Sequence, residues 1–165
     1  MMNSELKEQV YSELINEKLN QHNYKNNQSK KIGILYTKWN KKYIDYLVSG
    51  CEEKLNELGI KSANIVKMEL PGSYDLLYGV TALMNKKINL NAIITIGILL
   101  KGDTSHYEFL MNAIGSNLPR LQLHYSIPII NGILICETEK QIIQRTVNVN
   151  HGKIWAQAID DIINL

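Results

Sequence analysis

Gly97–Glu108 reads GILLKGDTSHYE and joins two segments of different hydrophobic periodicity. The apolar, β-branched segment Leu90–Ile96 before it predicts a buried parallel strand. After it, Ser105 and Glu108 have the spacing of a capping box that opens an apolar-periodic helix. A strand, a glycine-containing turn and a helix N-terminus direct backbone N–H groups toward one point, which indicates a phosphate-binding site. His106 lies in the first helical turn, where an imidazole is suited to carry protons. The same pattern also fits a capped helix with an incidental histidine.

Strand-like and helix-like segments alternate on both sides of this stretch. Strands are predicted over Ile32–Tyr36, Ser62–Leu70, Leu90–Ile96 and Pro128–Ile135. Helices are predicted from an Asn40 cap to Gly59, over Tyr74–Lys87, from Ser105 toward Tyr125, and over Glu139–Thr146 and His151–Ile163. Pro119 is expected to kink or split the third helix. Such alternation predicts right-handed crossovers onto a parallel sheet with helices on both faces, an α/β protein of three layers.

Ligands of parallel α/β sheets bind beyond the carboxyl ends of the strands. The predicted strand ends carry Thr37–Asn40, Pro71–Asp75, the turn before His106, and Asn131–Gly132. We therefore expect the chemistry of this protein to lie at these four positions.

Composition narrows the class of protein. A chain of 165 residues with 45% hydrophobic content predicts one core, and a net charge of +2 with interspersed signs argues against nucleic-acid or membrane partners. Cys51 and Cys136 lie in apolar periodic stretches, so they are expected to be reduced core residues of a cytoplasmic protein. No apolar run approaches about 18 residues, and no signal peptide is visible.

Residues 1–30 differ from the rest of the chain. Leu6, Val10 and Leu14 recur at helical spacing within Asn3–Asn20, which predicts an amphipathic helix, and the polar segment His22–Lys30 predicts a linker. The helix is equally consistent with a frayed appendage and with packing against a partner subunit. Residues 31–165 are expected to form the α/β domain.

Residues 31–163 resemble the lumazine synthase family. The most specific part is Gly102–Glu108, which is similar to the family signature Gly-Asp-Thr-x-His-aromatic-acid. Further matches are Trp39-Asn40, the turn Pro71–Asp75, the segment Pro128–Leu134, Arg145 with Lys153, and Asn150-His151-Gly152 before Trp155, which resembles fungal members. The resemblance implies a flavodoxin-like fold whose four parallel strands have the order 2-1-3-4.

The resemblance also implies an activity. The family condenses 5-amino-6-(D-ribitylamino)uracil with 3,4-dihydroxy-2-butanone 4-phosphate, releasing phosphate and water, in riboflavin biosynthesis. This transferase reaction needs no metal or redox cofactor. Most of the rate acceleration can therefore come from holding the two substrates together, which lowers the activation barrier by up to roughly 7–11 kcal/mol. Positioned proton transfer raises the rate by a further factor on the order of 10²–10⁴. Two other interpretations stay open: an archaeal-type riboflavin synthase, and a non-catalytic flavodoxin-like binding or scaffold module.

The matching positions imply a role for each residue. The pyrimidine and its ribityl chain would be bound by Trp39, Ser73, Tyr74, Asp75, Asn131 and the backbone of Ile98, Leu99 and Leu100. The phosphate would be bound by Asp103, Thr104, Arg145 and Lys153, with His106 as the proton carrier. Whether His151 or Lys153 supplies the extra positive charge stays open.

The implied site is shared between subunits. In the family, the regions of Asn131 and Arg145 come from the neighbouring subunit, so the resemblance implies a pentamer, which some members assemble into icosahedral shells. This chain departs from the family at two relevant positions. Asp75 replaces the more usual glutamate, and Asn131 stands where many members have phenylalanine.

Overall fold

The computed structural model describes residues 9, 12–13, 16–17, 21 and 24–165. Its centre is a four-stranded parallel sheet in the order β2-β1-β3-β4, which confirms the order implied by the family resemblance. The strands are β1 (Ile32–Thr37), β2 (Ile65–Leu70), β3 (Ala92–Leu100) and β4 (Ile129–Cys136). All three pairings are parallel, so the four carboxyl ends meet at one edge of the sheet.

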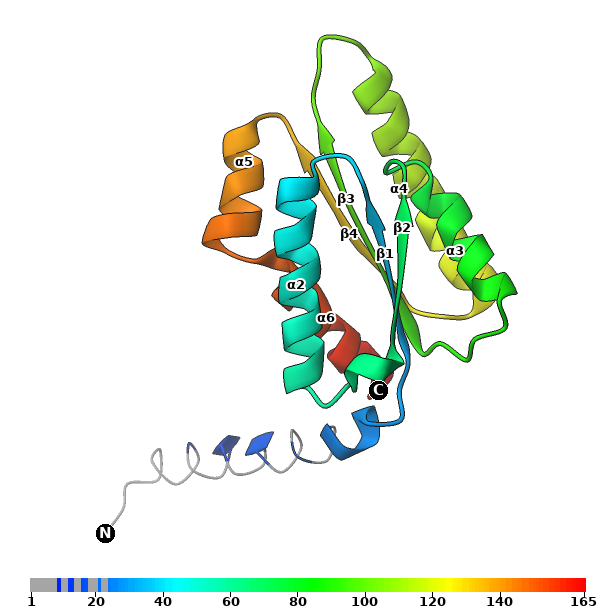
Figure 1. Ribbon diagram of the computed structural model, residues 1–165, viewed down its shortest axis with the longest axis vertical. Coiled ribbons are helices and arrows are strands. Elements are labelled where there is room, and N and C mark those ends of the chain that lie inside the picture. The colour runs from blue at the N-terminus through cyan, green and yellow to red at the C-terminus, as the bar shows by residue number, and fades with distance from the viewer. Residues whose placement is uncertain (1–8, 10–11, 14–15, 18–20, 22–23) are drawn as a thin grey trace.

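Helices cover both faces of the sheet and complete the flavodoxin-like three-layer fold (Figure 1). They are α2 (Lys41–Glu57), α3 (Leu76–Asn85), α4 (His106–Tyr125), α5 (Glu139–Ile143) and α6 (His151–Ile163), with a short 3₁₀ helix at Ser62–Asn64 and a π-helical turn, η2, at Gln144–Asn148. The helices α2, α5 and α6 pack on one face, and α3 and α4 pack on the other.

The core is divided by the sheet into two apolar clusters. Along β3, Ile94 and Ile96 enter the cluster beneath α2 and α6, whereas Ile93 and Leu99 enter the cluster beneath α3 and α4. Every residue of β3 except the last is therefore buried, as expected of a central parallel strand. Burial of this strand fixes its register and the position of its carboxyl end.

The strand boundaries differ from the sequence prediction by one to four residues, most of all in the second and third strands. The second strand begins at Ile65 rather than Ser62, because Ser62–Asn64 forms the 3₁₀ turn. The third strand continues through Gly97 to Leu100, since Gly97 provides room for a neighbouring side chain instead of turning the chain: a Cβ there would lie 2.7 Å from Ser73 Oγ.

The fourth strand also extends further than predicted. It runs from Ile129 to Cys136, one residue beyond the predicted end, and Asn131 lies near its start, opposite Thr95, and not at its carboxyl end. Gly132 is a packing position for α6, because a Cβ there would lie 2.8 Å from the Trp155 ring. The prediction that Asn131–Gly132 stands at a strand end is wrong.

Two predicted side-chain caps are absent from the helix N-termini. Neither Ser105 nor Asn40 caps its helix through its side chain, and Asn40 is left-handed with φ 60°. Glu108 does not close a capping box at Ser105; its carboxylate faces Lys101, with Oε1 3.8 Å from Nζ. Pro119 does not split α4. Because proline has no N–H, Pro119 cannot donate to the carbonyl of Gly115, four residues earlier in the helix. Gly115 is exposed, so water can hydrogen-bond to this carbonyl instead.

Part of the predicted N-terminal linker is ordered against the domain. The helix expected over Asn3–Asn20 lies largely outside the described residues, but Tyr24–Asn27 is helical and Asn27 is fully buried. Asn27 Nδ2 donates to the Leu58 carbonyl at 2.8 Å and to Asp160 Oδ1 at 2.5 Å. This polar network joins the N-terminal turn to the ends of α2 and α6. None of the described helices has the length and continuous hydrophobicity needed to cross a bilayer.

Candidate active site

A cavity of about 820 Å³ opens at the carboxyl end of the sheet, above β1 and β3. It is lined by the loop after β1, the loop after β2, the end of β3 and the first turns of α4 (Figure 1). The lining residues are Trp39, Asn40, Gly72, Ser73, Tyr74, Ile98, Leu99, Leu100, His106, Phe109 and Leu110. The structure thus brings together His106 and six of the eight residues that the sequence assigns to pyrimidine binding.

An exposed aromatic ring stands at the entrance of the cavity. Trp39 is 72% exposed, and its Cδ1 would lie 3.7 Å from a Cβ at Gly72, so the indole lies beside the turn after β2. Exposing the indole to water is unfavourable, but it leaves a flat aromatic face free to stack on a planar ligand. Tyr74, which is 49% exposed, adds a second ring from the neighbouring loop.

Asp75 does not line the cavity, in contrast to the sequence assignment. Its Oδ2 accepts a hydrogen bond of 2.9 Å from the Gly72 N–H and closes the turn on which Ser73 and Tyr74 stand. The side chain is one methylene shorter than the glutamate usual in the family, which suits it to this local contact.

The floor of the cavity is built from the end of β3. Ser73 is buried, and its Oγ donates to the Ile98 carbonyl at 3.4 Å. Gly97 makes this approach possible, as described above. The serine therefore fixes the loop after β2 to the strand whose backbone borders the cavity.

Phe109 and Leu110, which the sequence pattern did not single out, share the cavity with His106. Positions three and four residues apart lie on one face of a helix, so helical spacing from His106 would have identified both. Asn40 belongs to the strand end where chemistry was expected, although no binding role was assigned to it. It lines the cavity in a left-handed conformation, which is uncommon for residues other than glycine and is found at functional sites.

Four of the assigned residues lie elsewhere on this chain. Asp103 and Thr104 are exposed in the turn before α4, and neither Asn131 nor Arg145 lines the cavity. Arg145 lies in η2, where its Nη1 donates to the Gln141 carbonyl at 3.1 Å. Asn131 lies three residues before Leu134, which pairs with Ile98 where the cavity begins, and this corresponds to about 10 Å along a strand.

His151 and Lys153 have different environments. Lys153 Nζ lies 3.0 Å from Glu53 Oε2, so it is paired with α2. His151 packs edge-on against Trp155, with ring centroids 6.0 Å apart, and its pKa is lowered by burial and by the nearby Arg145 guanidinium. Lys153 is thus paired with Glu53, whereas the positive charge of Arg145 contributes to the lowered pKa of His151.

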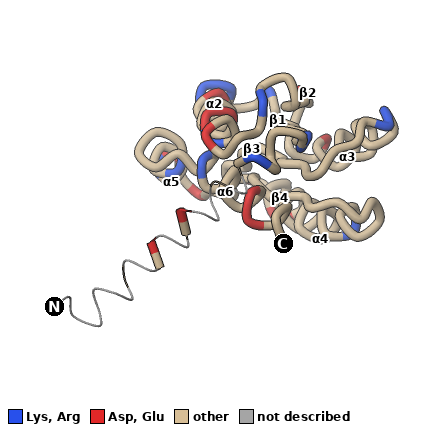
Figure 2. The backbone as a smooth tube through the Cα atoms, turned by 90° about the horizontal axis from the view of Figure 1, so that it is seen from below, with Lys and Arg blue, Asp and Glu red and all other residues tan. Residues whose placement is uncertain are grey.

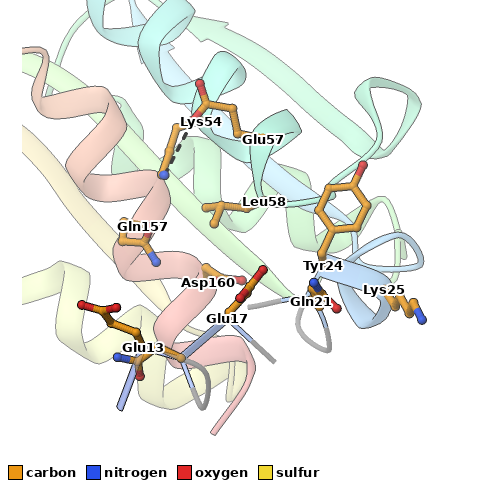
Figure 3. Close-up of a pocket in the computed structure, with 11 residues that line it drawn as sticks. Glu13, Glu17, Gln21, Tyr24, Lys25, Lys54, Glu57, Leu58, Gln157 and Asp160 are labelled. Carbon is orange, nitrogen blue, oxygen red and sulfur yellow. Dashed lines mark ion pairs between the residues drawn. The ribbon is translucent and has the colours of Figure 1, made fainter. Parts of the chain in front are cut away.

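A second cavity, of about 720 Å³, lies near the C-terminal ends of α2 and α6 (Figure 3). Tyr24 and Asp160 are among its lining residues, and the Lys54–Glu57 ion pair borders it. It lies at the opposite end of the molecule from the carboxyl ends of the strands, where parallel sheets bind their ligands. The first cavity is therefore the candidate active site.

Comparison with known proteins agrees with this geometry. The family model described as 6,7-dimethyl-8-ribityllumazine synthase matches residues 29–165. The chain belongs to this family. Among proteins named 6,7-dimethyl-8-ribityllumazine synthase, that of Parabacteroides distasonis is 36% identical, over 67% of this chain and 68% of the relative. That of Stenotrophomonas maltophilia is 33% identical, over 84% and 90% of the two chains. That of Pyricularia oryzae is 29% identical, over 78% and 84%.

The residues that match the family, 29–165, include the four strands and the helices α2 to α6. The match begins at residue 29, just after the buried Asn27. The N-terminal turn that holds Asn27 therefore lies outside the matched residues and packs onto the domain that they form.

Proposed function

We propose that this chain is a 6,7-dimethyl-8-ribityllumazine synthase of riboflavin biosynthesis. It would condense 5-amino-6-(D-ribitylamino)uracil with 3,4-dihydroxy-2-butanone 4-phosphate, with release of phosphate and water. The observation that carries the proposal is the cavity at the carboxyl end of the sheet, where a stacking aromatic, a strand-end backbone and His106 converge in a chain of this family. Residues 31–165 would form the catalytic domain.

The pyrimidine would lie in this cavity. Trp39 offers the stacking face, and the end of β3 offers backbone N–H and C=O groups to the edge of the ring. Ser73 and Tyr74 border the ribityl chain, and Asp75 acts by holding their turn. His106, at the start of α4, would carry protons during imine formation and phosphate loss.

The phosphate would lie between two copies of the chain. The exposed turn at Asp103 and Thr104 leads into the N-terminus of α4, which favours an anion through its free N–H groups. Arg145, with the two-pronged donor geometry suited to phosphate, lies on a different part of the surface and would serve a neighbouring copy. Lys153 would supply a positive charge beside it, and His151, whose pKa is lowered, would contribute a neutral imidazole as a hydrogen-bond donor.

A closed ring of subunits, a pentamer as in the family, is the assembly we propose. The α3–α4 layer supports it: α3 carries no charged residue, α4 carries only Glu108 and Arg120, and this layer is largely free of charge in Figure 2. Three large apolar side chains on it are more than half exposed, Tyr78, Phe109 and Leu123. An uncharged layer with exposed apolar side chains is typical of a surface that a partner covers. Cys51 and Cys136 are unpaired and buried, which fits a cytoplasmic enzyme.

Catalysis would depend chiefly on proximity. Two substrates held face to face in a cavity of about 820 Å³ lose their translational freedom on binding, which can supply up to roughly 7–11 kcal/mol of the barrier. Proton transfer by His106 would add a factor on the order of 10²–10⁴.

The test is incubation with both substrates while the absorbance of the lumazine and the release of phosphate are followed. Equimolar formation of both products is expected, and His106→Ala should slow turnover by about 10²–10⁴. Absence of product, or a wild-type rate for His106→Ala, would contradict the proposal. Conversion of the lumazine supplied alone would instead identify a riboflavin synthase.

A further inference from the structure

We infer that Asn150 is a positioning residue for the phosphate half of the site: it fastens the first turn of α6 to α2 and so fixes the end of the segment 144–151, which carries Arg145 and His151. The inference rests on the proposed function, because it concerns the phosphate-bearing substrate. Neither the family signature around His106 nor the residues assigned to substrate binding include Asn150.

Asn150 makes two hydrogen bonds that join α6 to α2. As the N-cap of α6, it accepts a hydrogen bond of 2.9 Å from the Gly152 N–H through Oδ1. Its Nδ2 donates to the Tyr46 carbonyl of α2 at 2.6 Å. The same amide therefore ends the loop after η2 and ties the start of α6 to the middle of α2.

Two glycines make this junction close. Any Cβ at Gly50 would collide with the Asn150 amide, and any Cβ at Gly152 would collide with the Leu47 carbonyl. At Gly152 the backbone of α6 approaches the backbone of α2 directly, and at Gly50 the Asn150 amide lies against α2. This leaves the backbone of residue 151 little freedom to shift.

This junction constrains the two groups proposed to bind the phosphate, Arg145 and His151. His151 lies between Asn150 and Gly152 and packs on Trp155, and η2, which carries Arg145, contacts α6. Arg145 is held from its own side by the Gln141 carbonyl, and the backbone of Val149 returns to η2 by donating to the Gln144 carbonyl at 3.0 Å. The segment 144–151 is a short loop fixed at both ends, and Asn150 fixes the end that carries His151.

Steady-state kinetics of the full-length protein with both substrates tests the inference, with inorganic phosphate as the probe of the anion site. Asn150→Ala removes both hydrogen bonds. We expect the KM for the butanone phosphate and the inhibition constant of inorganic phosphate to rise together, by up to about thirtyfold, the range of a lost helix cap. The KM for the pyrimidine should change less than about twofold, because no pyrimidine-side residue contacts this junction.

Gly50→Ala is the second variant, and it changes no group near the ligand. The added methyl displaces the flexible Asn150 amide while raising the helix propensity of α2, so the protein is expected to fold and still show the same KM increase. The matched control is Asn164→Ala at the other end of α6, which loses hydrogen bonds to Asp160 and Asn27. It should lower stability and leave both KM values unchanged.

Each outcome decides one question. If the wild-type protein has no lumazine synthase activity, the proposed function is overturned. In that case the affinity of the wild type and of Asn150→Ala for inorganic phosphate, measured by calorimetry, still tests the anion site. An active wild type whose Asn150→Ala and Gly50→Ala variants keep the normal KM for the butanone phosphate overturns the positioning role. Equal increases in both KM values, or the same increases in Asn164→Ala, would assign Asn150 a purely structural role and also overturn it.

Discussion

The buried amide of Asn27 offers a quantitative test of how the N-terminal turn is joined to the domain. Asn27→Ala removes three hydrogen bonds: two donated by Nδ2 to the Leu58 carbonyl and Asp160 Oδ1, and one accepted by Oδ1 from Asn164 Nδ2 at 3.2 Å. Because Asp160 is itself buried, loss of its donor leaves a carboxylate short of partners in a poorly solvated place.

The expected loss can be estimated from these bonds. The two bonds between neutral groups contribute about 1 kcal/mol each, and the bond to the carboxylate contributes about 1.5–3 kcal/mol. Asn27→Ala should therefore lower the free energy of unfolding by about 3–5 kcal/mol. For a chain of this size each kcal/mol lowers the Tm by about 2–4 °C, so a fall of roughly 6–20 °C is expected.

The assay is thermal and urea unfolding followed by circular dichroism. Protein concentration must be held constant, because an oligomer's Tm depends on it. Lys25→Ala, an exposed position in the same turn, is the matched control and should remain within about 0.5 kcal/mol of the wild type. A loss of less than about 1 kcal/mol in Asn27→Ala would refute the reasoning, since it would mean that the N-terminal turn does not depend on this network.

Three further predictions concern the site. Gly97→Ala places a methyl 2.7 Å from Ser73 Oγ, so it should lower the free energy of unfolding, measured in urea, by about 1–3 kcal/mol. It should also raise the KM for the pyrimidine, and an unchanged KM would contradict the role of the Ser73 contact. Asp75→Ala removes the acceptor of the Gly72 N–H and should raise the KM for the pyrimidine more than the KM for the butanone phosphate in steady-state kinetics. Asp75→Asn keeps an acceptor oxygen and should restore part of the affinity. Equal effects on the two KM values would contradict a local role for the carboxylate. The pKa of His151 is lowered from 6.5 in the folded protein, so its neutral form contributes stability that is complete above that value and is lost as the pH falls through the lowered folded-state pKa. Urea unfolding at about pH 7.5 and about pH 5 should therefore show a smaller acid-induced loss for His151→Gln than for the wild type; identical losses would exclude His151 as a source of acid sensitivity.

Much of the fold follows from local patterns. The β-branched run before Gly97 predicts a buried strand, and the apolar spacing after Asn40 and Ser105 predicts helices that pack on a sheet; both are confirmed. These patterns are readable because a parallel strand is buried on both faces, and a helix on one face, whatever the rest of the chain does. Where the chain actually changes direction was less predictable. Gly97 is a packing position inside a strand, since only the structure shows that Ser73 approaches it.

The candidate site also contains residues whose positions could be predicted from the sequence and residues whose contacts could not. The residues around His106, Trp39 and Ser73 were predictable, because each follows a strand and the carboxyl ends of parallel strands share one edge. The partners that the polar side chains choose were not predictable: Asp75 bonds to its own turn, Lys153 pairs with Glu53, and Asn150 bonds to the Tyr46 carbonyl of α2. By itself, the sequence determined the layers and the strand ends through periodicity, which is a local property. Only the tertiary structure decided which charged and polar groups face one another, because those contacts join segments that are distant in the chain and depend on how closely the helices approach.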